Sequence, residues 1–265
     1  MFDLALAAIL SLALLATLAI TGRLRFLAAE IPSLARRAAA LIILWLVLVL
    51  CVFYPTVAPG DAATVDPGSL SFVSIFTGQI VLGGFLLIWW RLAQSPPLAR
   101  FLHLEHWSSG DVRFGFGIGA FGWLAAIAAS ATVAAVLTLF GHSPSGGEQA
   151  LPFEVPPLLI WLAELPAWRK LLVVAVAMTV EEGFFRAFLQ TRFGWGFSSV
   201  LFALSHSGYG LPTLTASVFA VSLAIGWALR VRGNLVPCVV AHGIFDAVQL
   251  FVVMPLAIRH LQSLT

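Results

Sequence analysis

The sequence predicts an all-α fold, a polytopic membrane helical bundle of about eight transmembrane helices with a polar site in its C-terminal half. Composition is the first reason: 60% of the 265 residues are hydrophobic and only 10% are charged, whereas about 25% of the residues of a soluble domain are charged. The second reason is a series of apolar runs, most of them near the roughly 17–25 residues that a spanning helix needs. The runs lie at 2–22, 38–54, 70–90, 114–140, 168–190, 196–212, 213–230 and 235–257.

The sixth run differs from the others because it is short and ends in serine, glycine and proline residues between Ser205 and Pro212. Such residues favour a broken or re-entrant helix, which is tolerated at membrane depth only where it is buried in protein or lines a wet cavity. We expect a single membrane domain over 1–265, in which 1–150 supplies helices of generic membrane type. Its environment is the lipid bilayer, and the net charge of +2 gives no indication of nucleic-acid binding.

Arginine residues alternate between the connections that join these runs. Two connections, 55–69 and 141–166, contain no lysine or arginine. By the positive-inside rule, the arginine-bearing connections lie on the cytoplasmic side, and Arg169, Lys170 and Arg259 are exceptions. The arginine-bearing connections are those at 23–37, 91–113, 192 and 230–232.

Glycines recur in the fourth run, at Gly115, Gly117, Gly119 and Gly122. Small residues at such intervals let two membrane helices approach closely. We therefore expect these four residues to face a neighbouring helix.

Charged residues interrupt the fifth run in the phrase EEGFFR, from Glu181 to Arg186. Each charge at the centre of a spanning helix costs about 2.5–3.5 kcal/mol on insertion scales, so such residues indicate a function. Glu182 and Arg186 are four residues apart and can pair on one helix face. Glu181 is turned about 100° away from Glu182 and is left for chemistry. The alternative is a buried ion pair that only fixes helix packing.

Three further polar residues lie in the last apolar third: His206 in FALSH, and His242 and Asp246 in HGIFD. His242 and Asp246 are four apart and share a helix face. Counted from the predicted cytoplasmic end of each helix, Glu181, His206 and His242 lie at a similar depth of about 15–16 Å. Scattered structural residues have no reason to share one level, so the pattern predicts a common site. The alternative is hydrogen-bonded core residues.

A carboxylate with two imidazoles in a shielded pocket suits hydrolysis. Glu181 could act as general base on a water that His206 helps to hold. His242 and Asp246 could support the carbonyl oxygen as it gains charge, although an anionic Asp246 can act only by orienting His242. The alternative is a metal, because Glu181, His206 and His242 match a catalytic zinc shell in ligand type. The HExxH helix signature is absent, and ligand type alone leaves this choice open.

The three phrases EEGFFR, FALSH and HGIFD, in that order in late spans, resemble the CPBP family of intramembrane proteases. This family includes the Rce1-type CAAX prenyl endopeptidases and the bacteriocin self-immunity proteins. The resemblance covers about 165–255 and implies that this stretch is a catalytic core. Its members are labelled metalloproteases, and a glutamate-type mechanism without metal is also argued for them.

The resemblance also implies roles for individual residues. Glu181 corresponds to the catalytic base, and His206 to its water-holding partner. His242 and Asp246 correspond to the oxyanion side, where Asp246 replaces the asparagine of the prenyl-protease branch. The family's pattern gives Glu182 and Arg186 a less direct catalytic role.

We therefore interpret the chain as an intramembrane endopeptidase of a bacterial cell membrane that cleaves a lipidated (CAAX-type) or membrane-associated peptide. One alternative is a noncatalytic immunity or scaffold protein that binds a partner through the same polar cluster. Another is a proton-coupled transporter with a relay of carboxylates and imidazoles. The first half lacks the matching set of broken helices that a transporter built from repeats would have.

Overall fold

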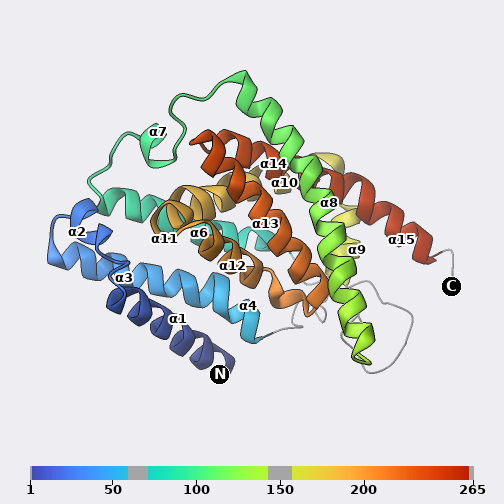
Figure 1. Cartoon of the computed structure of the whole chain (residues 1–265), viewed down its shortest axis with the longest axis horizontal. Coiled ribbons are helices and arrows are strands. Elements are labelled where there is room, and N and C mark those ends of the chain that lie inside the picture. The colour runs from blue at the N-terminus through green and yellow to red at the C-terminus, as the bar shows by residue number, and fades with distance from the viewer. Residues whose placement is uncertain (1, 59–70, 143–156, 263–265) are drawn as a thin grey trace.

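The computed structural model describes residues 2–58, 71–142 and 157–262, and this part of the chain is built from helices without a strand (Figure 1). Its elements up to residue 142 are α1 (Phe2–Ile20), α2 (Phe26–Glu30), α3 (Leu34–Leu48), a π-helical turn (Val49–Phe53), α4 (Tyr54–Val57), a 3₁₀ turn (Ser74–Phe76), α6 (Thr77–Leu92), α7 (Leu98–Phe101) and α8 (Ser109–Leu139). The elements from residue 157 onward are α9 (Pro157–Glu164), α10 (Ala167–Glu182), a π-helical segment (Gly183–Gln190), α11 (Thr191–Phe193), α12 (Trp195–Ser205), a 3₁₀ turn (Ser207–Tyr209), α13 (Pro212–Arg232), α14 (Val236–Val248), a π-helical turn (Gln249–Val253) and α15 (Met254–Gln262).

The predicted helical membrane bundle is confirmed. Within the described ranges, six helices are long and apolar enough to cross a membrane, and they correspond to the first four and the last two of the predicted runs. They are Phe2–Ile20, Leu34–Val57, Ser74–Leu92, Ser109–Leu139, Pro212–Arg232 and Val236–His260.

The two remaining predicted runs behave differently. The fifth run is helical from Ala167 to Phe193, and its charged residues keep it outside that group of six. The sixth run, 196–212, does not form one spanning helix, and the break that its serine, glycine and proline residues predict is present. α12 stops at Ser205 after 11 residues, a rise of about 16 Å against a hydrocarbon thickness of about 30 Å. The chain then makes a turn and starts α13 at Pro212, where a missing N–H costs little.

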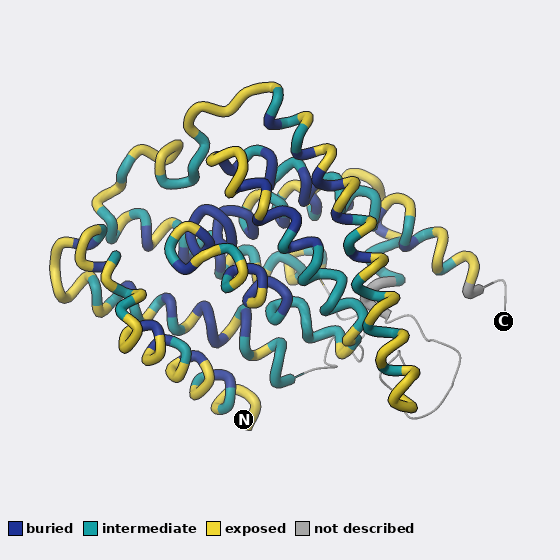
Figure 2. The backbone as a smooth tube through the Cα atoms, viewed as in Figure 1, coloured by how far each residue is buried: buried dark blue, intermediate teal, exposed yellow. Residues whose placement is uncertain are grey.

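The helices of the polar motifs occupy the middle of the bundle. In Figure 1, α1 and α3 lie along one edge, α8 runs down the other side with α15 projecting beyond it, and α10, α12 and α13 lie between α3 and α8. α8 packs against α13 and α14, and α14 also packs against α10. Figure 2 shows the buried backbone gathered in this central region, while the outer turns of α1 and α8 are exposed. The exposed side chains there include Ile9, Phe121 and Leu124, which suit contact with lipid.

An aromatic cluster joins the first part of the chain to the π-helical segment Gly183–Gln190. All eight residues of this segment are buried. The Phe188 ring lies 4.8 Å from the Phe85 ring and 4.6 Å from the Trp89 ring, both on α6. Edge-on aromatic pairs of this kind add about 0.5–1.5 kcal/mol beyond the area they bury. The segment that follows the two glutamates is therefore held by a helix from the first half.

The structure brings several arginine-bearing connections together at one end of the bundle. Glu30 Oε2 accepts hydrogen bonds from Arg192 Nη2 (2.8 Å) and Trp89 Nε1 (3.3 Å). Arg232 pairs with Asp111 at the start of α8. The first contact joins the connection 23–37 to Arg192, and the second joins the connection 91–113 to that at 230–232. Residues 59–69 and 143–156 of the two connections without lysine or arginine lie outside the described residues.

Lys170 and Arg169, two of the predicted exceptions to the positive-inside rule, have structural partners. The Lys170 Nζ donates to the carbonyl oxygens of Ala163 (2.6 Å) and Leu250 (3.2 Å), so Lys170 ties α10 to α9 and to the π-helical turn after α14. The Arg169 guanidinium lies over the rings of Phe72 and Trp168. These cations therefore have local roles.

Two of the α8 glycines lie against α14. A Cβ atom on Gly115 would lie 2.8 Å from the Pro237 carbonyl oxygen, and one on Gly119 would lie 2.9 Å from that of Ala241. A Cβ on Gly117 would meet nothing within 4 Å. The predicted close contact is thus correct for Gly115 and Gly119 and wrong for Gly117, and a Cβ on Gly122 would make an ordinary contact with Val221 at 3.8 Å. At about 100° per residue, Gly117 is turned away from the face that Gly115 and Gly119 share.

We expect Gly115→Ala to lower the melting temperature in detergent, because the added methyl group overlaps the α14 backbone at a cost of about 1–3 kcal/mol. Gly117→Ala is the matched control and should leave the melting temperature unchanged or raise it, since alanine is the better helix former. Thermal unfolding followed by circular dichroism measures both. Equal melting temperatures for the two variants would contradict the close α8–α14 contact.

Candidate active site

Glu181 lies near the C-terminal end of α10 and contacts two other helices. Its Oε1 accepts a 2.8 Å hydrogen bond from Gln79 Nε2 on α6. Its Oε2 lies 3.8 Å from the Nε2 of His206, the residue at which α12 ends. The distance is too long for a direct hydrogen bond. It suits two atoms that share one small molecule between them.

The contacts of His206 determine which ring nitrogen carries the proton. Its Nδ1 lies 2.8 Å from the carbonyl oxygen of Phe202. A carbonyl oxygen can only accept, so Nδ1 carries the proton and donates it. In the neutral ring Nε2 is then an acceptor. The acceptor Nε2 and the carboxylate of Glu181 therefore face each other.

Glu182 points to a different set of partners. It is fully buried, and its Oε2 accepts from Arg186 Nε at 3.0 Å, as the four-residue spacing predicts. Its Oε1 accepts from His242 Nδ1 on α14 at 2.8 Å. Arg186 Nη2 donates in turn to Ser222 Oγ on α13 at 2.8 Å. One carboxylate thus links α10, the π-helical segment, α13 and α14.

His242 lies between two carboxylates. Its second nitrogen, Nε2, is 3.3 Å from Asp246 Oδ2. When both carboxylates are ionised, both ring nitrogens must donate, so His242 is an imidazolium. The charges of Glu182, Asp246, Arg186 and His242 then sum to zero. A balanced cluster suits apolar surroundings, in which an isolated charge is costly.

The Phe202 ring lies between the two histidines. Its centroid is 4.6 Å from the His206 ring and 5.8 Å from the His242 ring. The Arg186 guanidinium carbon lies 5.2 Å from the same centroid. The six predicted residues therefore form two neighbouring groups, Glu181 with His206, and Glu182 with Arg186, His242 and Asp246. Glu181 and Glu182 are almost completely buried, whereas the side chains of His206 and Asp246 are 29% and 26% exposed.

Sequence reasoning missed three residues that surround Glu181. Gln79 donates to its carboxylate, and Cys51 and Tyr209 interact with it electrostatically. Tyr209 interacts with Asp246 as well. Gln79 and Cys51 are single polar residues in apolar runs of the first half, and no spacing linked them to the motifs. For Tyr209, the only indication in the sequence was the broken helix predicted from the serine and glycine residues around it.

The three candidate zinc ligands do not fit a zinc ion in this arrangement. Zinc needs a lone pair from each coordinating nitrogen at about 2.0–2.1 Å. Both nitrogens of His242 are engaged by carboxylates, and the structure pairs His242 with Glu182 rather than with Glu181. Within the described part of the chain, no three His, Cys, Asp or Glu side chains are grouped as a metal site.

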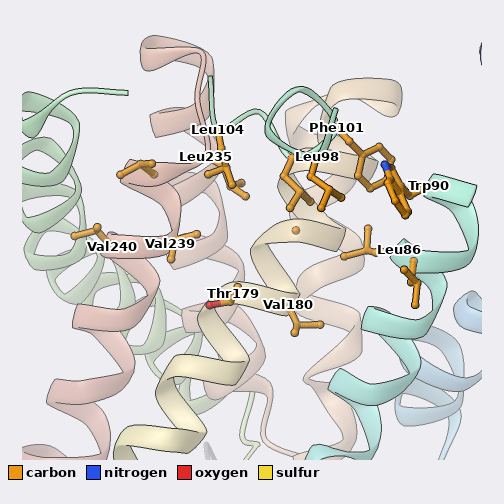
Figure 3. Close-up of a pocket in the computed structure, with 14 residues that line it drawn as sticks. Leu86, Trp90, Leu98, Phe101, Leu104, Thr179, Val180, Leu235, Val239 and Val240 are labelled. Carbon is orange, nitrogen blue, oxygen red and sulfur yellow. The ribbon is translucent and has the colours of Figure 1, made fainter. Parts of the chain in front are cut away.

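An apolar cavity of about 410 Å³ lies beside the polar site. Figure 3 shows Leu86 and Trp90 of α6 on one side of it and Val239 and Val240 of α14 on the other. α10 contributes Thr179 and Val180, and the π-helical segment contributes Gly183, but the two glutamates between them do not line the cavity. Thr179 is the one polar side chain among the residues that line the cavity. The cavity therefore borders the opposite face of α10 from the two carboxylates.

Comparison with known proteins adds one positive result. Residues 163–248 match the model of a family described as type II CAAX prenyl endopeptidase Rce1-like. The match includes all six predicted site residues. No curated protein and no solved structure matches the chain.

We expect Glu182→Ala to lower the free energy of unfolding by about 3–5 kcal/mol, because it leaves the buried Arg186 without a carboxylate partner and His242 with Asp246 alone. Glu105→Ala is the matched control, since its ion pair with Arg100 is exposed and such pairs contribute about 0–1 kcal/mol. Unfolding in detergent by heat or denaturant measures both variants. A Glu182→Ala protein as stable as Glu105→Ala would contradict the central position of Glu182.

Proposed function

We propose that this chain, in which residues 163–248 match the Rce1-like family of type II CAAX prenyl endopeptidases, hydrolyses a peptide bond inside the membrane. The observation that carries the proposal is the Glu181 carboxylate 3.8 Å from the acceptor nitrogen of His206. Two bases at this distance are arranged to hold and activate one water molecule. A purely structural pair would instead form a direct hydrogen bond.

In the proposed reaction the water donates its hydrogens to Glu181 Oε2 and His206 Nε2. Glu181 removes a proton as the water oxygen forms a bond to the carbonyl carbon of the peptide. The protonated Glu181 then gives that proton to the leaving amide nitrogen as the C–N bond breaks. His206 can hold the water in this way because its other nitrogen is engaged with the Phe202 carbonyl.

We assign to His242 the stabilisation of the negative charge that develops on the peptide carbonyl oxygen. Its Nδ1 is held by the short bond to the buried Glu182, whereas its Nε2 makes the longer 3.3 Å contact with Asp246. The Nε2 proton is therefore the one free to turn to the carbonyl oxygen as that oxygen becomes negative. Asp246 acts through the ring, because an anionic carboxylate keeps Nε2 protonated. Glu182 and Arg186 are positioning residues in this scheme.

The cavity supports a lipidated substrate. Leu86, in the cavity wall, lies seven residues after Gln79 on the same face of α6, roughly 10 Å along the helix. A chain bound there would lie on the opposite face of α10 from Glu181 and about two turns of α6 from Gln79. Each buried methylene contributes about 0.8 kcal/mol, so an acyl or isoprenyl chain would supply much of the binding energy. The bacterial cell membrane as the location stays a prediction.

We expect Glu181→Gln to reduce cleavage of a lipidated CAAX-type peptide in detergent by about 10²-fold or more, because an amide cannot accept the proton. Glu105→Gln, at an exposed position, is the control, and melting temperatures verify folding. The noncatalytic alternative predicts full biological activity for Glu181→Gln. The assay is repeated with a chelator, and cleavage should continue; loss of cleavage would refute the metal-free step.

We expect Val236→Trp, which fills part of the cavity, to raise the KM for a lipidated peptide about tenfold or more through lost burial of the chain. The same peptide without its lipid should be cleaved as by the unmodified protein. Val231→Trp, at an exposed position on α13, is the control. An unchanged KM for the lipidated peptide would show that the lipid chain does not bind in the cavity.

A further inference from the structure

Gln79 connects the first half of the chain to the proposed catalytic base. It lies in the first turn of α6, outside the segment 163–248 that matches the family model. Its Nε2 and Glu181 Oε1 are 2.8 Å apart, although the residues are separated by 102 positions in the sequence. The two oxygens of Glu181 therefore have different surroundings. Oε1 is held by the amide, and Oε2 is left facing His206.

The other end of the same amide has a different environment. Gln79 Oε1 is buried, and no described residue donates a hydrogen bond to it. The orientation of the amide follows from its partner, because a carboxylate accepts and the NH₂ group must point to it. A buried amide oxygen without a donor is uncommon in folded proteins and calls for an explanation. A ligand that brings a donor to this point supplies one.

We propose that Gln79 is a further substrate-contacting and positioning residue, whose Nε2 holds Glu181 while its Oε1 accepts a hydrogen bond from a backbone N–H of the bound peptide. The proposal rests on the proposed endopeptidase function. A peptide with its carbonyl carbon at Glu181 has backbone N–H groups on both sides of that carbon. An amide is suited to the position because it is neutral and does not compete for the proton that Glu181 takes.

This assignment gives the first half of the chain a part in the reaction. Gln79 decides which oxygen of Glu181 can act as the base, since only Oε2 is free to meet a water held by His206. It also relates the peptide to the cavity, because Leu86 and Trp90 continue the same face of α6 into the cavity wall. The face of α6 that bears Gln79 therefore also bears two residues of the cavity wall.

The test uses the full-length protein and a set of peptides in which each backbone nitrogen in turn is methylated. For the unmodified protein we expect one N-methyl position to reduce kcat/KM about tenfold or more, the effect of one lost hydrogen bond. Gln79→Met keeps the length of the side chain and removes the amide. In this variant the same N-methyl group should reduce kcat/KM by less than about threefold. A merely structural role would leave that N-methyl penalty unchanged.

The second readout is the pH dependence of kcat/KM. Loss of the donor changes the hydrogen bonding of the proposed base, so the pH profile of Gln79→Met should differ from that of the unmodified protein. The amide of Gln79 does not titrate, and the titratable side chains that interact with Glu181, namely His206, Cys51 and Tyr209, all remain in place. Ile80→Ala, at the neighbouring exposed position, is the control and should change neither readout.

Gln79→Asn is a second variant that retains the amide and is one methylene too short to reach. It should behave as Gln79→Met, and melting temperatures verify that both are folded. If the unmodified protein cleaves and both variants keep its kcat/KM and its N-methyl penalties, the assignment of Gln79 is wrong and the endopeptidase function stands. If the unmodified protein cleaves no lipidated or membrane-associated peptide, the proposed function and this inference both fail.

Discussion

A carboxylate that is shielded from water must have its charge balanced by its neighbours, and Glu182 is where this constraint is met. Glu182 is completely buried, and each of its oxygens has one cationic partner, Arg186 or His242. Removing either partner would leave an unpaired charge, which costs several kcal/mol in a buried site. Because Arg186 also reaches Ser222 and His242 reaches Asp246, the same requirement brings together α10, α13 and α14.

The position of Glu181 follows from that of Glu182. Once Glu182 is tied to α13 and α14, the rotation of α10 is set, and the preceding side chain must point to a different neighbour. It reaches α6 and the end of α12, where Gln79 and His206 lie. The helix widens to a π-helical segment directly after the two glutamates, a feature often found at functional sites. The aromatic cluster with α6 holds this segment in place.

Local patterns in the sequence predicted much of this arrangement. The spacing of four residues was enough to pair Glu182 with Arg186 and His242 with Asp246, because neighbours on one helix face need no tertiary information. Hydropathy located most of the helices. Average hydropathy counted the sixth run as a span because it does not register where the backbone stops being helical, whereas the serine, glycine and proline residues from Ser205 to Pro212 indicated the break that the structure has. Gln79 could not be predicted, since one polar residue in an apolar run carries no periodic signal.

The sequence alone determined which chemical groups are available and roughly how deep they lie, because helix rise, residue spacing and hydropathy are local properties. It also determined that charged residues would need partners inside an apolar bundle. Only the tertiary structure decided which carboxylate meets which imidazole and which amide meets Glu181. Those pairings depend on how α6, α10, α12 and α14 are rotated and offset against one another, and packing between distant segments sets that geometry.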